Sequence, residues 1–366
     1  MSATTSFFPS RTVAIYMGRM FLVRTFGILL ALLLVLQTLD LLSESGAILA
    51  VKGNGQAQIL TYVGLRGPQI AAFLLPFSVL LGTILTLITM NQNSEVIALK
   101  AAGLSAHQVL APLLLSSMVV AGISFAFNER IVARATATLD QWKKVNYGPL
   151  PLDGGERANV WVRDGDDLIE VDQVRGRGAA TELGNITLYD RTGGNLVAIV
   201  RAPRGRHGPG GWRIGPATRF DVASGQLVQL GTTTIARAVR PEQFTLGSVN
   251  AEGLSFFGLR AAIADLADAG RPTKALEGTL WHKLSGPLSA ILMPLLGAVA
   301  AFGIARSGKL FVRAVIGMAL GFAYFVADNF ALAMGNLGAY PPFLAAWAPF
   351  LLFLLIGEAV LIRTEE

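Results

Sequence analysis

Six apolar stretches of about 20 residues each constrain what this chain can fold into more than any other feature. Spanning the hydrocarbon core of a bilayer takes roughly 20 apolar residues in a helix. Three of the stretches precede a more polar central segment and three follow it. The sequence therefore predicts a polytopic α-helical membrane protein with six transmembrane helices in a 3 + 3 arrangement. The stretches are Val23–Leu42, Ile70–Met90, Val109–Phe127, Leu284–Ala305, Ala314–Met334 and Leu344–Ile362.

The distribution of charge divides the chain into the same parts. Residues 128–272 contain 18 basic and 16 acidic side chains, so 23% of this segment is charged, whereas the other 221 residues are 9% charged. A soluble domain typically has roughly 25% charged residues. We therefore predict transmembrane helices 1–3 over residues 1–127, a soluble domain with flanking helices over 128–272, and transmembrane helices 4–6 over 273–366.

Basic residues in the short loops predict the orientation, because cytoplasmic loops carry an excess of Lys and Arg. One side of the predicted topology carries eight of them, and the other carries only Lys52 and Arg66. Both termini are therefore expected in the cytoplasm, and residues 128–272 on the far side, which is the periplasm if the host is a bacterium with two membranes. Most of the net charge of +6 follows from this topology, so nucleic-acid binding is not predicted. The eight are Arg11, Arg19, Arg24, Lys100, Arg306, Lys309, Arg313 and Arg363.

Short alternating runs separated by turn residues fill most of the central segment. Turn signals include Arg163–Asp166 and Thr192–Asn195. About seven such runs with little helix predict an antiparallel all-β domain of the sandwich or jelly-roll type. Helical periodicity precedes the runs in 128–145 and returns in Ser255–Ala269. The runs are Val160–Arg163, Leu168–Val174, Gly184–Asp190, Leu196–Arg201, Ala217–Val222, Leu227–Leu230 and Thr232–Ala238.

The sequence contains no convincing catalytic or metal-binding constellation. Cysteine is absent and the three histidines are far apart. The acidic residues between Asp164 and Asp172 do not follow EF-hand spacing and suit a hairpin with a solvated face. Gly303–Lys309 fits the Walker pattern, but it follows a predicted membrane helix, and Leu310 stands where a hydroxyl would hold magnesium. We therefore expect no cofactor on this chain, and any ATP must be bound by a partner.

Two carboxylates lie inside predicted spans, Asp40 in the first and Asp328 in the fifth. A charge in the bilayer core costs about 2.5–3.5 kcal/mol on insertion scales. Both lie about 15 residues beyond a cytoplasmic arginine, hence at similar depth toward the outer leaflet. Two interpretations remain open, which are interfacial placement in contact with water and a shared polar cavity. In the fifth span, Gly317 and Gly321 form a GxxxG pattern that lets helices approach closely.

The loop between the second and third spans carries a short amphipathic helix near residues 94–104. Asn93 or Ser94 is the expected cap, and Glu95 in the first turn suits the helix dipole. The helix is either a surface connector or a coupling helix that docks into a moving partner. In the second interpretation its contact residues are Ser94, Glu95, Leu99, Lys100 and Gly103.

This loop resembles a motif of a known family. Ser94-Glu95 followed by 98–105 is similar to the SE-x-x-x-x-x-A-x-G-x-S loop of the LptF/LptG permeases of the lipopolysaccharide-export ABC transporter. The resemblance covers nearly the whole chain and includes Trp161–Gly165 and Tyr340-Pro341-Pro342. Asp40 and Asp328 look more like the LptG branch than the LptF branch.

The resemblance implies a function and a set of partners. Such a permease would extract lipopolysaccharide from the outer leaflet of the inner membrane and pass it to a periplasmic bridge. It would pair with the related permease LptF, with a cytoplasmic ATPase dimer, LptB, and with the single membrane helix of LptC. The first and fifth spans would frame the cavity and its lateral gates, the central domain would be a β-jellyroll, and the helix at Glu95 would couple to the ATPase. Alternatives are the LptF role, or a permease or scaffold of another ABC-type lipid or lipoprotein export system.

One departure from the family concerns the outer end of the first helix. LptG sequences have lysines there that suit the phosphates of lipid A, whereas Gln37–Glu44 contains no cation. Either Lys52 or Arg66 substitutes, or the substrate headgroup differs. The candidate cavity and gate residues are Gln37, Asp40, Ser43, Glu44, Lys52, Arg66, Gly317, Gly321 and Asp328.

Overall fold

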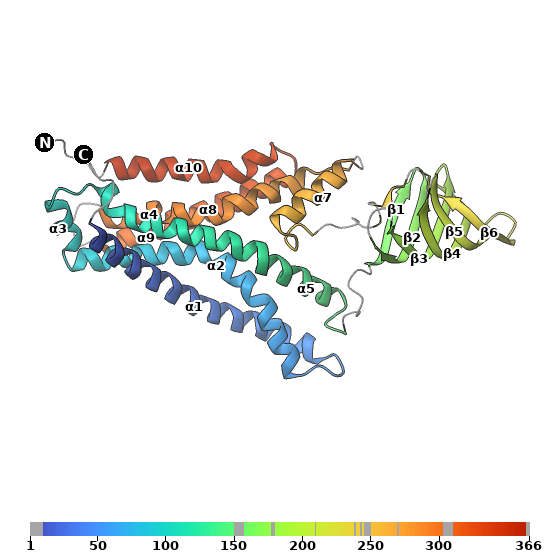
Figure 1. Cartoon of the computed structure of the whole chain (residues 1–366), viewed down its shortest axis with the longest axis horizontal. Helices are drawn as coiled ribbons and strands as arrows, with labels where there is room; N and C mark the ends of the chain where they lie inside the picture. The colour runs from blue at the N-terminus through green and yellow to red at the C-terminus, as the bar shows by residue number, and fades with distance from the viewer. Residues whose placement is uncertain are drawn as a thin grey trace. The chain divides into compact units, whose positions relative to one another are not determined.

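The chain folds into two compact units (Figure 1). The helical unit comprises Met1–Gly148, Ala251–Arg260 and Lys274–Glu366, and the β unit comprises Pro149–Asn250 and Ala261–Thr273. Helix α7, Phe256–Asp268, contributes residues to both units. The computed structural model describes residues 10–149, 157–176, 180–208, 210–237, 239–241, 244, 250–268, 271–302 and 310–363.

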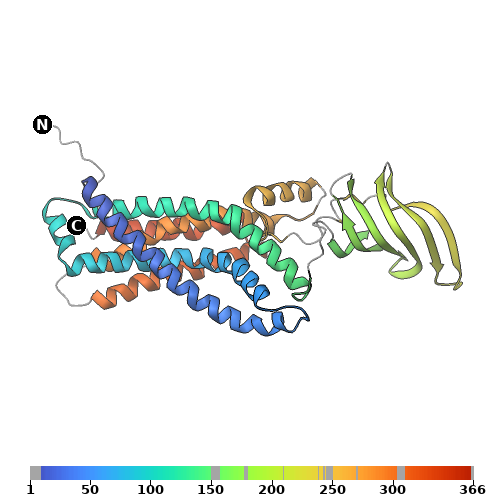
Figure 2. The same cartoon turned by 60° about the horizontal axis from the view of Figure 1, so that its bottom comes forward.

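Long helices joined by short turns make up the helical unit (Figure 1, Figure 2). Capping defines two of their starts, because the Ser10 hydroxyl accepts from the N–H of Val13 and Ser105 forms a capping box with Gln108. The start of α1, the end of α10 and helix α3 lie at the same end of the unit. The elements are α1 (Arg11–Leu49), α2 (Gln56–Gln92), α3 (Glu95–Ala101), α4 (Ala106–Phe127), the π-helical turn η1 (Asn128–Val132), α5 (Ala133–Lys144), α8 (Lys274–Phe302), α9 (Leu310–Asn336) and α10 (Pro342–Arg363).

Within the described residues, five helices are long and apolar enough to cross a membrane. They are α1, α2, the continuous helix Ala106–Lys144, α9 from Ala314, and α10. The predicted fourth span, Leu284–Ala305, coincides with α8 as far as Phe302, and its last residues lie outside the described part of the chain. The Walker-like segment Gly303–Lys309 lies outside it as well. Five apolar helices therefore match predicted spans, and a sixth span stays a prediction.

A single apolar core joins the long helices. It includes Phe21 of α1, Leu87 of α2, Leu113 of α4, Leu296 of α8 and Phe353 of α10. Large apolar side chains also cover the outer faces, a distribution that suits lipid rather than water as the surrounding solvent. Examples with at least half of their surface exposed are Val23, Leu34, Leu60, Phe322, Phe330 and Leu355.

Small residues set the closest helix contacts. A Cβ atom added at Gly82 of α2 would lie 3.0 Å from the backbone N and Cα of Thr25 in α1. One added at Gly297 of α8 would lie 2.9 Å from the Cγ2 methyl of Thr83. Without a hydrophobic driving force between helices in lipid, such close approach provides much of the packing energy. These glycines therefore fix the distances from α2 to α1 and to α8.

The β unit contains one antiparallel meander with strand order β1-β2-β3-β4-β5-β6. Two-residue hairpin loops at Gly165 and at Gly193-Gly194 join β1 to β2 and β3 to β4, and these glycines have positive φ angles, as the turn signals predict. Buried Trp212 donates its indole N–H to the carbonyl of Val239 at 2.8 Å and packs on Phe244, so a core covers one face of the sheet. The strands are β1 (Arg157–Asp164), β2 (Asp167–Arg175), β3 (Glu182–Thr192), β4 (Asn195–Gly208), β5 (Gly211–Asp221) and β6 (Leu227–Ile235).

The prediction of an antiparallel β domain inserted between membrane helices is confirmed, with differences in detail. The runs expected at 227–230 and 232–238 contribute to one strand, β6, which ends at Ile235, because pairing with β5 continues on both sides of Gly231; Ala238 lies outside the described residues. Strand β4 extends to Gly208, seven residues beyond its predicted end. The six described strands pair in sequence order within one sheet, so the jelly-roll topology stays a prediction.

We expect Gly82→Ala to destabilise the helical unit, because the added methyl group meets the backbone of Thr25 and forces α1 and α2 apart. The expected loss is about 1–3 kcal/mol, as for other overpacked sites. A fluorescence-monitored thermal midpoint in mild detergent measures it. The control is Gly122→Ala in α4, where an added Cβ meets nothing within 4 Å. Equal midpoints for the two variants would contradict this account of the α1–α2 contact.

Candidate substrate cavity and coupling helix

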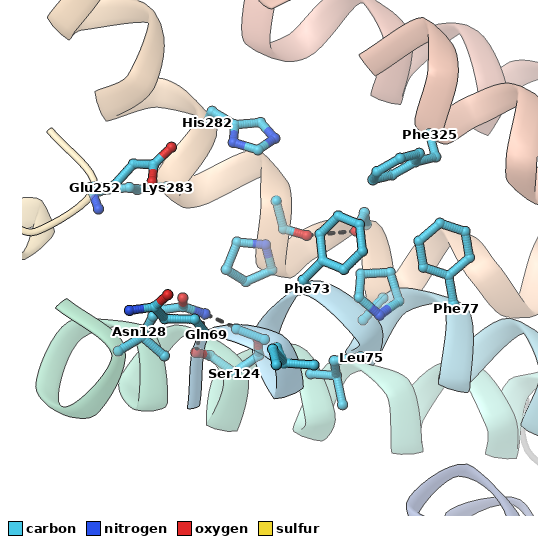
Figure 3. A pocket seen from close by; sticks show the side chains of 18 of the residues that line it. Gln69, Phe73, Leu75, Phe77, Ser124, Asn128, Glu252, His282, Lys283 and Phe325 are labelled. Carbon is cyan, nitrogen blue, oxygen red and sulfur yellow. Dashed lines mark hydrogen bonds between the residues drawn. The ribbon is translucent and has the colours of Figure 1, made fainter. Parts of the chain in front are cut away.

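A cavity of about 880 Å³ lies within the helical unit. Residues of α1, α2, α4, η1, α5, α8 and α9 form its walls, together with Glu252 and Ser255 before α7. Three phenylalanines make one wall, with the ring of Phe325 in α9 at 5.4 Å from Phe73 and 4.9 Å from Phe77 of α2. Polar and charged groups line the opposite part, as Figure 3 shows for Asn128, Glu252, His282 and Lys283. The cavity therefore offers adjoining polar and apolar surfaces.

Asp40 is the centre of a hydrogen-bond network on the cavity wall. The hydroxyl of Tyr62 donates to its Oδ2 at 2.6 Å, and the guanidinium of Arg66 donates to both carboxylate oxygens at 3.1–3.3 Å. Arg66 also donates from Nη1 to Oε1 of Gln69 at 2.6 Å. Tyr62 and Arg66 are four residues apart on α2, so they share one helix face. The network therefore links α1 to α2.

Asp328 has a different environment. It is 6% exposed, and its Oδ2 lies 2.9 Å from Nε2 of His282 in α8. Its other oxygen, Oδ1, is buried without a hydrogen-bond partner in the structure. Asp40 and Asp328 both line the cavity. The sequence left two interpretations open, a shared polar cavity and interfacial contact with water. The positions of the two aspartates agree with a shared cavity, and the burial of Asp328 does not agree with interfacial contact.

The remaining residues proposed for the outer end of α1 do not line this cavity. Gln37 is buried, and its amide oxygen faces Gly67 of α2. The residues of α1 that line the cavity are Leu36, Leu39 and Asp40. Ser43 and Lys52 are exposed. Of the two cations considered as substitutes for the missing lysines, only Arg66 reaches the cavity.

Glu44 binds residues at the end of α5 and just after it, and it does not line the cavity. Its carboxylate accepts from Lys143 at 3.0 Å and from the hydroxyl of Tyr147 at 2.6 Å. Burial and the bond to Glu44 raise the pKa of Tyr147, so this phenol stays protonated and donates at neutral pH. Asn54 donates to the carbonyls of Ile48 and Tyr147 at 2.9 Å. Glu44 therefore anchors the outer end of α1.

The GxxxG pattern of α9 serves packing inside the chain. Gly321 lies against the side chain of Leu80 in α2, and Gly317 is buried. Gly321 also lines the cavity beside Phe325. The close approach that the motif predicts is thus made by α2 of the same chain at Gly321.

Helix α3 is attached to the helical unit by its apolar face. Val96 is buried in the main core, and Leu99 and Leu104 pack against it. Ser94 is at the N-cap position with φ 59°, but its side chain makes no capping bond, which differs from the predicted cap. The carboxylate of Glu95 accepts from the hydroxyl of Tyr16 in α1 and from the amide of Asn93, both at 3.2 Å.

The outer face of α3 is open. Ile97 is 53% exposed, Ser94 and Lys100 are exposed, and Gly103 ends the helix with φ 86°. An exposed isoleucine on a seven-residue helix between long apolar helices suits contact with another protein.

Sequence reasoning missed three partners. His282 was set aside because no other histidine lies near it in sequence, yet it pairs with Asp328 across 46 residues. Glu358 of α10 lies 3.2 Å from Nε2 of His107 in α4. Glu129 in the π-helical turn accepts from the N–H of Phe256 at 2.6 Å and so caps α7. Charged groups in apolar helices require partners, and this requirement was the available signal.

Comparisons with known proteins identify the family. The family model for the lipopolysaccharide export system permease LptF/LptG matches residues 15–363. The chain belongs to the LptF/LptG family. Similar proteins include LptG of Escherichia coli K12, 25% identical over 313 residues that cover 82% of this chain and 84% of that protein. LptG of Haemophilus influenzae is 24% identical over 323 residues, covering 84% and 87%. Like other LptF/LptG permeases, the chain is a multi-pass inner-membrane protein of the lipopolysaccharide export system and a transport subunit, with five apolar helices among its described residues.

We expect the Asp40–Arg66 pair to show energetic coupling. Asp40→Ala and Arg66→Ala each leave one charge unpaired, and each lowers the unfolding free energy by about 1–2 kcal/mol for a partly exposed pair with good geometry. The double variant is expected to lose about 1 kcal/mol less than the two single losses combined.

Denaturation of the four proteins in the same detergent measures this cycle. Lys52→Ala is the control, because Lys52 is exposed and loss of its charge alone is expected to change little. Strictly additive losses would mean that the two side chains do not stabilise the α1–α2 contact together.

Proposed function

We propose that this protein is the LptG-type permease subunit of the lipopolysaccharide exporter. It extracts lipopolysaccharide from the outer leaflet of the inner membrane and passes it toward a periplasmic bridge, with energy from ATP hydrolysis on a separate subunit. The observation that carries this proposal is the cavity, in which a polar wall with Asp40 and Asp328 adjoins an aromatic wall with Phe325. An amphipathic lipid needs both surfaces next to each other. The LptG names of the similar proteins and the paired aspartates favour LptG over LptF.

The size of the cavity supports pairing with a second permease. A volume of about 880 Å³ is in the range of a site for one small ligand, whereas lipopolysaccharide carries several acyl chains. A related LptF subunit would supply the other half, and the single membrane helix of LptC would lie at a lateral gate. In this arrangement α8 also crosses the membrane, as the fourth of six spans along the chain. Both termini are cytoplasmic, and the β unit is a periplasmic jelly roll.

Helix α3 is the proposed contact with the LptB ATPase dimer. Its apolar side packs in the core through Val96, so a displacement of the exposed side at Ile97 and Lys100 would be transmitted directly to α2 and α4. The contact of Glu95 with Tyr16 adds a path to α1. ATP would thus be bound by the partner, with no cofactor on this chain.

Site-specific photocross-linking tests the cavity. We expect a benzophenone amino acid at Phe325 to cross-link lipopolysaccharide in membranes, and the yield to fall when the ATPase works. The control position is Leu355 on α10, which is 68% exposed and does not line the cavity. Equal yields at both positions with no response to ATP would overturn the substrate assignment, and a different cross-linked lipid would indicate another lipid exporter.

Charge reversal tests the coupling helix. An ATPase is expected to co-purify with the protein in mild detergent, and Glu95→Lys to lower lipid release at least tenfold while ATP hydrolysis continues. Arg363→Glu is a matched charge reversal at the end of α10, and Tyr16→Phe removes only the hydrogen bond to Glu95. Arg363→Glu should keep coupled transport, whereas Tyr16→Phe should lower it less than Glu95→Lys does, because the contacts of Val96 with the core remain. Wild-type release by Glu95→Lys would show that α3 is a passive connector.

A further inference from the structure

The charges that line the cavity are unusual for a site that binds phosphates. Among its lining residues, the basic ones are Arg66 and Lys283, and the acidic ones are Asp40, Glu129, Glu252 and Asp328. Two positive and four negative charges give a formal charge of −2 with His282 neutral. Phosphate sites in proteins instead gather Arg, Lys and backbone N–H groups.

The guanidinium of Arg66 already uses three of its five N–H groups within this chain. Its Nε and Nη2 donate to the carboxylate of Asp40, and its Nη1 donates to Gln69. All three nitrogens therefore have a partner, and the positive charge is offset by a carboxylate about 3 Å away. A phosphate at the other two N–H groups of Arg66 would be repelled by the carboxylate of Asp40, which is held in place by Tyr62 at 2.6 Å.

The second cation has carboxylates near it as well. Lys283 of α8 interacts electrostatically with Glu129 and Glu252, and Figure 3 shows Glu252 beside it. Glu129 is fixed by the N–H of Phe256, which keeps its charge at this place. Neither cation of the described cavity wall is thus without a nearby carboxylate of the same chain.

We infer that this half of the cavity accepts a lipid headgroup without net negative charge at this depth, namely a sugar head that presents hydroxyl or ammonium groups rather than phosphates. The inference rests on the proposed function, because it concerns the same cavity and the same class of lipid. Hydroxyls and ammonium groups are donors, and carboxylates are acceptors only. The lining is rich in acceptors, and Oδ1 of Asp328 lacks a donor in the structure. A phosphate would meet net repulsion there.

Binding of two lipids to the full-length protein in nanodiscs tests this inference. The probes are lipid A with both phosphates and the same lipid A after both phosphates are removed. We expect wild-type protein to bind the dephosphorylated lipid at least as tightly as the phosphorylated one, with little change between low and high salt. A tenfold preference of the wild-type protein for the phosphorylated lipid that weakens with salt would overturn the inference.

Release of Arg66 from its partner sharpens the test. Asp40→Asn removes the charge that offsets Arg66 but keeps an oxygen that can accept from Tyr62. It should raise the affinity for phosphorylated lipid A about tenfold and leave the affinity for the dephosphorylated lipid unchanged. Asp172→Asn, an equal charge change at an exposed position of β2, should change neither. No gain for Asp40→Asn would contradict the role given to Asp40.

A double variant covers the case in which Asp40→Asn does not fold. Asp40→Asn with Arg66→Gln removes both charges together, so binding of both lipids should stay within twofold of wild type. Selective loss of the phosphorylated lipid would show that Arg66 binds phosphate, which overturns the inference but keeps the lipid-binding function. If neither lipid binds wild-type protein, the proposed function fails first.

Discussion

The polar contacts of Asp40 and Glu44, together with a small apolar cluster around Ile48, hold the C-terminal half of α1 to the rest of the helical unit. In the first half of α1, Met17, Phe21 and Thr25 are buried in the helix bundle. Beyond Thr25, only Gln37 and Ile48 of this helix are buried. The carboxylates of Asp40 and Glu44, one turn apart, bind Arg66, Tyr62, Lys143 and Tyr147, and Ile48 packs in a small apolar cluster with both of these tyrosines. Such bonds strengthen as water is excluded, because charges interact more strongly at low dielectric.

The difference in attachment between the two halves of α1 determines which contacts must break if α1 moves away from α2. Separation of the C-terminal half of α1 from α2 would break the hydrogen bonds to Asp40 and the apolar contact of Ile48 with Tyr62, and leave the apolar core around Phe21 in place. Close backbone contact at Gly82 and Thr25 would remain as the fixed point of such a movement. The two ends of α1 are thus attached in different ways, by the large apolar core at Phe21 and by polar bonds with a smaller apolar cluster at Asp40 and Ile48.

The sequence predicts those features that depend on neighbouring residues better than those that depend on contacts between distant parts of the chain. Apolar runs and hairpin glycines act locally, so five apolar helices and the turns at Gly165 and Gly193 were predictable. The depth of Asp40 and Asp328 followed from counting along helices, and both line one cavity. Their partners depend on helix rotation and crossing, which no local pattern contains, so the pairing of His282 with Asp328 was missed and the burial of Gln37 against Gly67 was not foreseen.

The two cavity aspartates differ in a way that affects their use. Asp40 is partly exposed and both of its oxygens are hydrogen-bonded, so it is stable as a charged structural group. Asp328 is buried and has one oxygen without a donor, a situation that costs about 1–3 kcal/mol. A hydroxyl or ammonium group that enters beside His282 could supply this bond after a small rotation of the Asp328 side chain. Asp40 therefore maintains the wall of the cavity, and Asp328 is the carboxylate that gains most from a bound headgroup.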